Sequence, residues 1–207
     1  RRMIDDDIYN LRITLAWASE HDIQAALSLA APLIDWCQQR GLYAEGKRLI
    51  NEVLALRSAS DHSIPLAKTL MEAGLFMLDC DEHENAQAYE EESLLLSQKL
   101  GYSEGEAGAL LALGRIAYFG WDDLRAAGRY YERSLAKFRE LGDPVGTSET
   151  LTFLAQIAIC RADLPRAREL AGEGVTITQQ AGVRFPRVLR ILGTVAFAED
   201  NLELARS

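Results

Sequence analysis

The chain has 207 residues, of which 48% are hydrophobic and 26% are charged, so it can bury a core and is not a disordered segment. Its formal charge of −9 at pH 7 argues against direct binding to nucleic acid, because that contact depends on a surplus of Lys and Arg. The apolar runs are short and interrupted, which excludes a transmembrane helix.

The cysteines and the two ends of the chain indicate where it works. Cys37, Cys80 and Cys160 lie far apart and form no CxxC pair. This favours a reducing, cytoplasmic setting over a disulfide framework. The start, RRMIDDD, lacks the apolar core of a signal peptide, and the chain begins with Arg. We therefore expect a cytoplasmic fragment of a longer polypeptide.

Apolar residues recur at intervals of three and four, the period of an amphipathic helix. The pattern predicts helices at residues 5–20, 23–40, 43–56, 65–79, 84–100, 104–119, 123–141, 145–160, 164–181 and 186–198. Pro32 is expected to kink the second helix near Leu29, since proline removes a backbone hydrogen bond. Ser63 and Asp143 have the residue type and the following proline of helix N-caps. The last predicted turn is EDN, at residues 199–201.

Small residues repeat along the chain in a fixed register. One series occupies the first helix of each predicted hairpin, at spacings of 40, 40, 41 and 38: Ile34, Gly74, Gly114, Ala155 and Gly193. Ile34 departs from the pattern, because the other four are small. A second series occupies the second helix, at spacings of 40, 41, 40 and 38: Gly46, Ala86, Ala127, Ala167 and Ala205. Small side chains let paired helices approach closely. Units repeated at this period are typical of a helical solenoid.

The segments LALGRIA, DLRAAGRYYERSLAKFRELGD and LGTVAFAEDNLELAR resemble the tetratricopeptide repeat (TPR), which is ordinarily about 34 residues long. The resemblance implies an all-α, right-handed superhelix of about five hairpins with one extra N-terminal helix. The expected repeats of this single domain, residues 1–207, are 23–58, 64–100, 104–141, 144–181 and a truncated 186–207.

Two phrases, EEESLLLSQKLG and ERSLAKFRELGD, resemble the longer repeats of bacterial LuxR-type (MalT-like) regulators of the STAND class. The segment DDDIYNLRITLAWASEHD is similar to the part that joins their nucleotide-binding module to the repeats. The resemblance implies a sensor or interaction module in such a transcriptional regulator or signalling ATPase. The alternative is a free-standing TPR adaptor that scaffolds a protein complex.

This chain departs from the repeat pattern at several places. The turn FGWDD carries one extra residue, and Glu90 and Ala171 stand where Tyr131 supplies an aromatic ring. Trp121 in that turn either fills the gap between adjacent hairpins, the reading we favour, or projects as a contact residue.

The sequence offers no motif for catalysis. It contains no glycine-rich phosphate loop, no GxSxG and no HExxH, so we expect neither an enzyme nor a bound cofactor. The densest polar cluster, residues 79–84, falls in an inter-helix turn and lacks metal-ligand pair spacing, so no metal site is expected. The run Glu90–Glu92 is predicted to be the exposed side of a helix.

The TPR resemblance further implies that first helices line a concave groove. The carried-over groove candidates are Lys68, Met71, Leu75, Leu111, Arg115, Tyr118, Glu149, Gln156, Arg187 and Arg190, with Thr152 among their neighbours. The mixture of apolar, aromatic and charged side chains could take an extended peptide, a partner helix or a small-molecule effector. Neighbouring domains of the parent protein are the other expected partners; nucleic acid and membrane are not.

Overall fold

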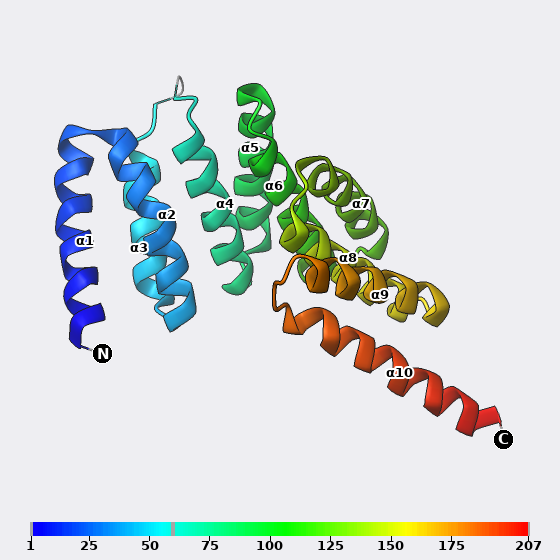
Figure 1. The fold of residues 1–207 in the computed structure, drawn as a ribbon. Coiled ribbons are helices and arrows are strands. Elements are labelled where there is room, and N and C mark those ends of the chain that lie inside the picture. Colours follow the sequence, from blue (N-terminus) through cyan, green and yellow to red (C-terminus); the bar gives the residue numbers. More distant parts are fainter. Residues whose placement is uncertain (1, 59–60, 207) are drawn as a thin grey trace. The chain divides into compact units, whose positions relative to one another are not determined.

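A computed structural model describes residues 2–58 and 61–206, and every regular element in them is helical (Figure 1). The helices are α1 (Arg2–His21), α2 (Ile23–Arg40), α3 (Tyr43–Ala55), α4 (Ile64–Asp79), α5 (His83–Leu100), α6 (Ser103–Arg115), the π-helical turn η1 (Ile116–Gly120), α7 (Leu124–Leu141), α8 (Pro144–Cys160), α9 (Leu164–Gln180) and α10 (Pro186–Arg206). Within these residues, none of the helices combines the length and apolarity that crossing a bilayer requires.

The chain divides into two compact units, Arg1–Ala112 and Leu113–Ser207, with the boundary inside α6. In the first unit, α1 packs on α2, α2 packs on α3 and α4, and α4 packs on α5. In the second unit, α7 packs on η1 and α8, α8 packs on α9, and α10 contacts both α8 and α9. Consecutive helices therefore form antiparallel neighbours within each unit, as the repeat pattern predicts.

The helix boundaries have clear local causes. The side chain of Asp143 accepts hydrogen bonds from the backbone N–H groups of Val145 and Gly146, at 2.9 and 3.1 Å. Ser63 Oγ accepts from the N–H of Leu66 at 3.3 Å. Both predicted N-caps are confirmed, and each satisfies a backbone donor that the first helical turn leaves without a partner.

The turn inside each hairpin repeats the same backbone conformation. The residues with positive φ in these turns are Gly41 (68°), Asp81 (59°), Asp122 (52°) and Ala162 (57°). They are spaced by 40, 41 and 40 residues, the spacing of the small-residue series. Three of the four are not glycine, although left-handed backbone costs an L-residue roughly 1–2 kcal/mol. The packed helices on both sides impose this turn.

The first-helix glycines give room to one large side chain from the second helix. A Cβ at Gly114 would lie 2.3 Å from the ring of Tyr131, and one at Gly74 would lie 2.6 Å from the side chain of Glu90. The register of small residues is confirmed at these hairpins. The register also corrects one prediction: Glu90 is fully buried, because it holds the position over Gly74 that Tyr131 holds over Gly114. Only its neighbours in the run face outward.

α2 is one helix with Pro32 inside it, as the sequence predicts, and the kink near Leu29 stays a prediction. Another helix runs on where the sequence predicted a break. α10 continues through residues 199–201, where we predicted the EDN turn, so the structure has no second helix in the fifth repeat. The few residues after that turn are too short to form a stable separate helix, because helix nucleation is costly. The side chain of Ala205 lies outside the described part.

Trp17 lies on the exposed side of α1. Its side chain is 59% exposed and stacks on the ring of His21. Leu15 and Ala18 are the buried residues of this part of α1.

The extra residue of the FGWDD turn is accommodated by η1. The N–H of Trp121 donates to the carbonyl of Ile116 at 3.2 Å, five residues back, and the N–H of Asp123 donates to the carbonyl of Ala117 at 2.8 Å. This widened turn lets the hairpin hold one more residue while Asp122 keeps the left-handed conformation of its counterparts. α6 would otherwise continue as an ordinary α-helix.

Candidate functional site

The second unit contains a pocket of about 450 Å³ that gathers residues from three first helices. Arg115 ends α6, Tyr118 and Phe119 come from η1, and the rest come from α8 and α10. The complete lining is Arg115, Tyr118, Phe119, Thr152, Phe153, Gln156, Arg187, Arg190 and Ile191. A volume of this size lies within the range of ligand-binding pockets.

Aromatic rings form one side of the pocket and the layer beneath it. Tyr131 is fully buried and stacks on Phe153, with ring centroids 5.2 Å apart and an interplanar angle of 11°. Phe119 meets Phe153 edge-on at 6.3 Å and Tyr118 edge-on at 4.7 Å. Phe119 is itself 59% exposed, so its ring offers an apolar face at the mouth of the pocket.

Three arginines give the pocket positive charge in an otherwise acidic chain. Arg187 is engaged: its Nη1 lies 3.2 Å from Oε1 of Glu149, and its guanidinium lies 5.7 Å from the ring of Phe153. Among the side chains that the structure describes in the second unit, residues 113–198, no carboxylate lies at ion-pair distance from Arg115 or Arg190. Arg115 Nε is in addition buried, and none of these residues offers it a hydrogen-bond acceptor.

Tyr118 stands beside these arginines in a partly dehydrated position. Its hydroxyl lies 3.3 Å from Sγ of Cys160. Burial, together with this neighbour, raises the pKa of Tyr118 to about 12. Tyr118 is therefore a neutral hydroxyl at physiological pH and adds a polar group without a charge.

The pocket brings together half of the predicted groove residues: Arg115, Tyr118, Gln156, Arg187 and Arg190. Glu149 lies next to it as the partner of Arg187. The structure also adds residues that the sequence prediction omitted: Phe119, Phe153 and Ile191. Phe119 follows directly from the extra residue in its turn, so that departure was the signal for it. Phe153 carried no such signal, because an apolar residue on α8 reads equally well as core.

The remaining groove candidates belong to the first unit. Lys68 is exposed on α4 and its Nζ lies 5.7 Å from the ring centroid of Tyr102. Met71 packs near Gly108, where an added Cβ would lie 2.8 Å from its sulfur. Leu75 is half-buried and Leu111 is buried. Met71 and Leu111 therefore serve packing in addition to any surface role.

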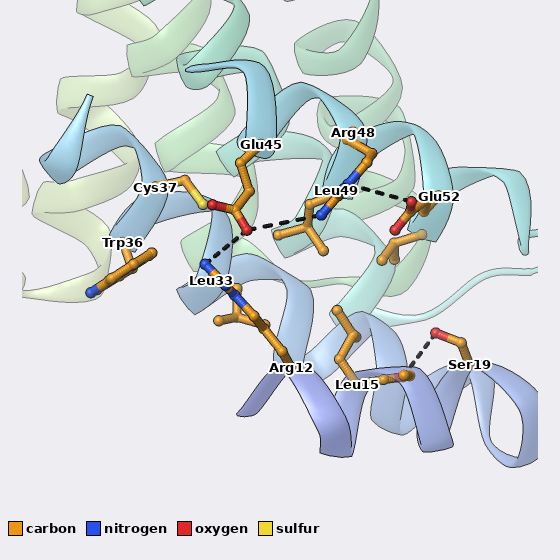
Figure 2. Close-up of a pocket in the computed structure, with 12 residues that line it drawn as sticks. Arg12, Leu15, Ser19, Leu33, Trp36, Cys37, Glu45, Arg48, Leu49 and Glu52 are labelled. Carbon is orange, nitrogen blue, oxygen red and sulfur yellow. Dashed lines mark hydrogen bonds and ion pairs between the residues drawn. The ribbon is translucent and has the colours of Figure 1, made fainter. Parts of the chain in front are cut away.

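A second pocket, of about 210 Å³, lies within the first unit between α1, α2 and α3 (Figure 2). Its walls include the apolar side chains of Leu15, Leu33 and Leu49, and charged side chains stand at its rim. Arg12 pairs with Glu45 at 2.7 Å, and Arg48 lies 3.9 Å from Glu45 and 3.6 Å from Glu52. The two arginines are thus paired with the two glutamates, so the pocket has no unpaired charge among these four side chains.

Two further side chains belong to the α2 wall of this second pocket. Trp36 lies between two guanidinium groups, with Arg12 at 5.7 Å and Arg40 at 5.4 Å from its ring. Cys37 is buried, and burial raises the pKa of its thiol, so it stays protonated near neutral pH. A protonated thiol is a weak nucleophile, which gives this pocket no evident chemistry of its own.

The acidic turn at residues 79–84 serves contacts between hairpins. Gln38 Nε2 donates to Oδ2 of Asp79 at 2.6 Å, and Lys47 Nζ donates to Oε1 of Glu82 at 2.5 Å. The hydrogen bond to Lys47 lowers the pKa of Glu82. In the described part of the chain, no three His, Cys, Asp or Glu side chains are grouped so that they could hold a metal ion.

No model of a known protein family matches the chain, and no curated protein matches it in sequence. Solved structures do match its fold. BtubC (BKLC) from P. vanneervenii is 19% identical with a TM-score of 0.78, over 98% of this chain and 86% of that one. A putative kinesin light chain from Podosopora anserina, with nearly identical TPR-like repeats, is 17% identical with a TM-score of 0.70, over 90% and 92%.

A third structure shows the same fold inside a larger protein. It is a signal transduction ATPase with numerous domains (STAND) from Pyrococcus horikoshii with a tetratricopeptide repeat sensor, 14% identical with a TM-score of 0.71. The match covers 98% of this chain and 33% of that one. Together the fold and these likenesses define an all-α helical repeat protein of the TPR-like class.

Proposed function

We propose that this chain is a non-catalytic binding module whose ligand is a segment of a partner protein. The observation that supports the proposal is the pocket of the second unit, where five predicted groove residues from three helices surround one volume. Exposed aromatic and arginine side chains, such as Phe119 and Arg190, are the residue types that contribute most to protein recognition.

Peptide selection tests this proposal. A displayed library of random dodecapeptides is selected on the 207-residue chain, and the affinity of synthetic copies of the winners is measured by fluorescence anisotropy. The double variant Arg115→Ala/Tyr118→Ala should keep its helical circular dichroism and bind these peptides at least about tenfold more weakly, because two pocket contacts are lost. Arg133→Ala is the matched control, since Arg133 is exposed on α7 outside the pocket.

Two outcomes would contradict it. If the double variant binds as well as the original chain while its stability collapses, Arg115 and Tyr118 are core residues. If no dodecapeptide is selected, the pocket does not serve peptide recognition.

For the parent protein, we propose a bacterial STAND-type regulator or signalling ATPase of the LuxR (MalT-like) kind, in which this chain is the sensor. The phrases EEESLLLSQKLG and ERSLAKFRELGD support this reading, and the STAND protein with a repeat sensor is a structural parallel. Ligand binding would act by favouring one of two states of the parent, which requires different affinities for the two. The alternative is a free-standing cytoplasmic adaptor.

Sequencing of the gene upstream of the codon for residue 1 distinguishes the sensor hypothesis from the adaptor hypothesis. A Walker-type GxxxxGK[ST] loop encoded there supports the sensor, because that loop binds the nucleotide of a STAND ATPase. A start codon a few residues upstream leaves the adaptor.

A further inference from the structure

Building on the proposed function, we infer that the pocket of the second unit selects an acidic segment, one whose Asp or Glu carboxylate sits between Arg115 and Arg190. The inference concerns the chemistry of the ligand, and it comes from the distribution of charge in and around the pocket.

Among the side chains described in the second unit, the three arginines of the pocket have one acidic ion-pair partner. Glu149 neutralises Arg187 through the 3.2 Å contact described above. The lining residues themselves include Arg115 and Arg190, which make no described ion pair, and no Asp or Glu, although the whole chain carries a formal charge of −9. A cationic site on an acidic protein focuses the local field on anions and repels cations, so charge complementarity selects an anionic occupant.

Arg115 supplies a second, independent observation. Its Nε is buried and has no acceptor in the described residues, which is unusual for a group that donates strongly. An unsatisfied buried donor is costly, and a carboxylate entering the pocket can satisfy the guanidinium fork with two parallel hydrogen bonds. Ligand binding would therefore relieve a cost that the empty pocket bears.

The aromatic wall completes the site. Phe119 is 59% exposed beside the arginines and is held by edge contacts to Tyr118 and Phe153. It can cover the apolar stem of an acidic side chain and the residue next to it, while the carboxylate meets the guanidinium groups. Excluding water in this way strengthens a charged contact.

Glutamine substitutions test the inference with the dodecapeptides selected above, synthesised with blocked termini so that only side chains carry charge. The selected sequences should be enriched in Asp and Glu. Arg115→Gln and Arg190→Gln should each weaken binding by about tenfold to a hundredfold. Replacing the peptide's acidic residues by Asn or Gln should cause a similar loss. Arg133→Gln, outside the pocket, should leave the affinity unchanged.

Glu149→Gln distinguishes a role of the arginines in binding from a merely structural one, because it should increase the affinity for the acidic peptide. It frees Arg187 and raises the positive charge beside the pocket by one. Binding of the acidic peptide should tighten several-fold, with a steeper dependence on salt. The Arg187–Glu149 pair is partly exposed, so its removal should leave the fold intact.

The ¹⁵N resonance of Arg115 Nε, assigned with Arg115→Lys, reports binding directly. It should shift on addition of the acidic peptide and stay in place with the Asn/Gln version. If neutral peptides bind the pocket and ignore the arginine variants, the inference fails while the proposed function stands. If inorganic phosphate or acetate binds as tightly as the peptide, the site takes free anions, and the inference is overturned. If no peptide binds the pocket, both fail.

Discussion

At the scale of single residues, the hairpins depend on matched sizes across each helix pair. Gly114 accepts the ring of Tyr131, and Gly74 accepts the carboxylate side chain of Glu90. In the next hairpin Ala155 and Ala171 are both small and belong to one buried cluster. A large residue on the second helix therefore requires glycine on the first, because interiors are close-packed.

Gly114→Ala tests this matching. The added methyl would lie 2.3 Å from the buried ring of Tyr131, so either the ring or the helix must move. We expect the free energy of unfolding in urea to fall by about 1–3 kcal/mol.

The control for this substitution is Gly172→Ala in α9, where an added Cβ meets nothing within 4 Å. There the methyl should raise the free energy of unfolding by roughly 0.4–1 kcal/mol, because alanine favours a helix more than glycine does. If both variants behave alike, the close packing at Gly114 is not what requires glycine.

At the scale of helices, the pocket of the second unit includes side chains that one inserted residue positions. In two hairpins the residue with the left-handed turn conformation lies seven positions after the small residue of the first helix: Asp81 after Gly74, and Ala162 after Ala155. In the hairpin between them, Asp122 lies eight positions after Gly114. The π-helical turn η1 holds the difference, and it carries Tyr118 and Phe119. Such turns are frequent at functional sites because they change the direction of side chains without ending a helix.

Deletion of Gly120 should restore the spacing of the other hairpins. We expect the chain to fold with unchanged helical circular dichroism and a free energy of unfolding within roughly 1 kcal/mol of the original, because one π-turn becomes α-helix. Phe119 should leave the pocket, and binding of the selected peptides should weaken at least about tenfold. A crystal structure checks the turn and anisotropy checks the affinity. Full binding by the deletion variant would show that η1 is incidental.

At the scale of the whole chain, the repeats raise the question of how many cooperative units exist. The sequence predicts one domain, and the structure divides into two compact units whose boundary falls between Ala112 and Leu113. That boundary lies inside α6, which is one continuous helix. Unfolding of either unit would therefore remove part of this helix, which both units contain.

We predict a single urea transition. Trp36 reports on the first unit and Trp121 on the second. The double variant W17F/W121F keeps Trp36 as its one tryptophan, and the double variant W17F/W36F keeps Trp121. Their midpoints should coincide, because α6 couples the units. Two separated midpoints would mean that the units unfold independently and that the chain comprises two domains.

Local sequence patterns were sufficient for much of this protein. The period of three and four, the small-residue register, and caps such as Ser63 and Asp143 depend on interactions between near neighbours. They predicted the helices, nearly all the turns and the TPR-like class. Half of the predicted groove residues share the pocket, among them Arg115, Gln156 and Arg190, which the TPR resemblance, carried over along the repeat register, implied.

Tertiary packing decided the rest. Glu90 reads as exposed in its own helix, and only the glycine opposite shows that it is buried. The pairing of Arg187 with Glu149 joins two helices that are separated in sequence, and among the described side chains of the second unit it leaves Arg115 and Arg190 without an ion-pair partner. The sequence FGWDD showed the extra residue. Whether that residue would enlarge the turn or form η1 depended on the packing of the two helices that the turn connects. Contacts between segments that are distant in sequence produce no local sequence pattern, so the sequence alone could not predict them.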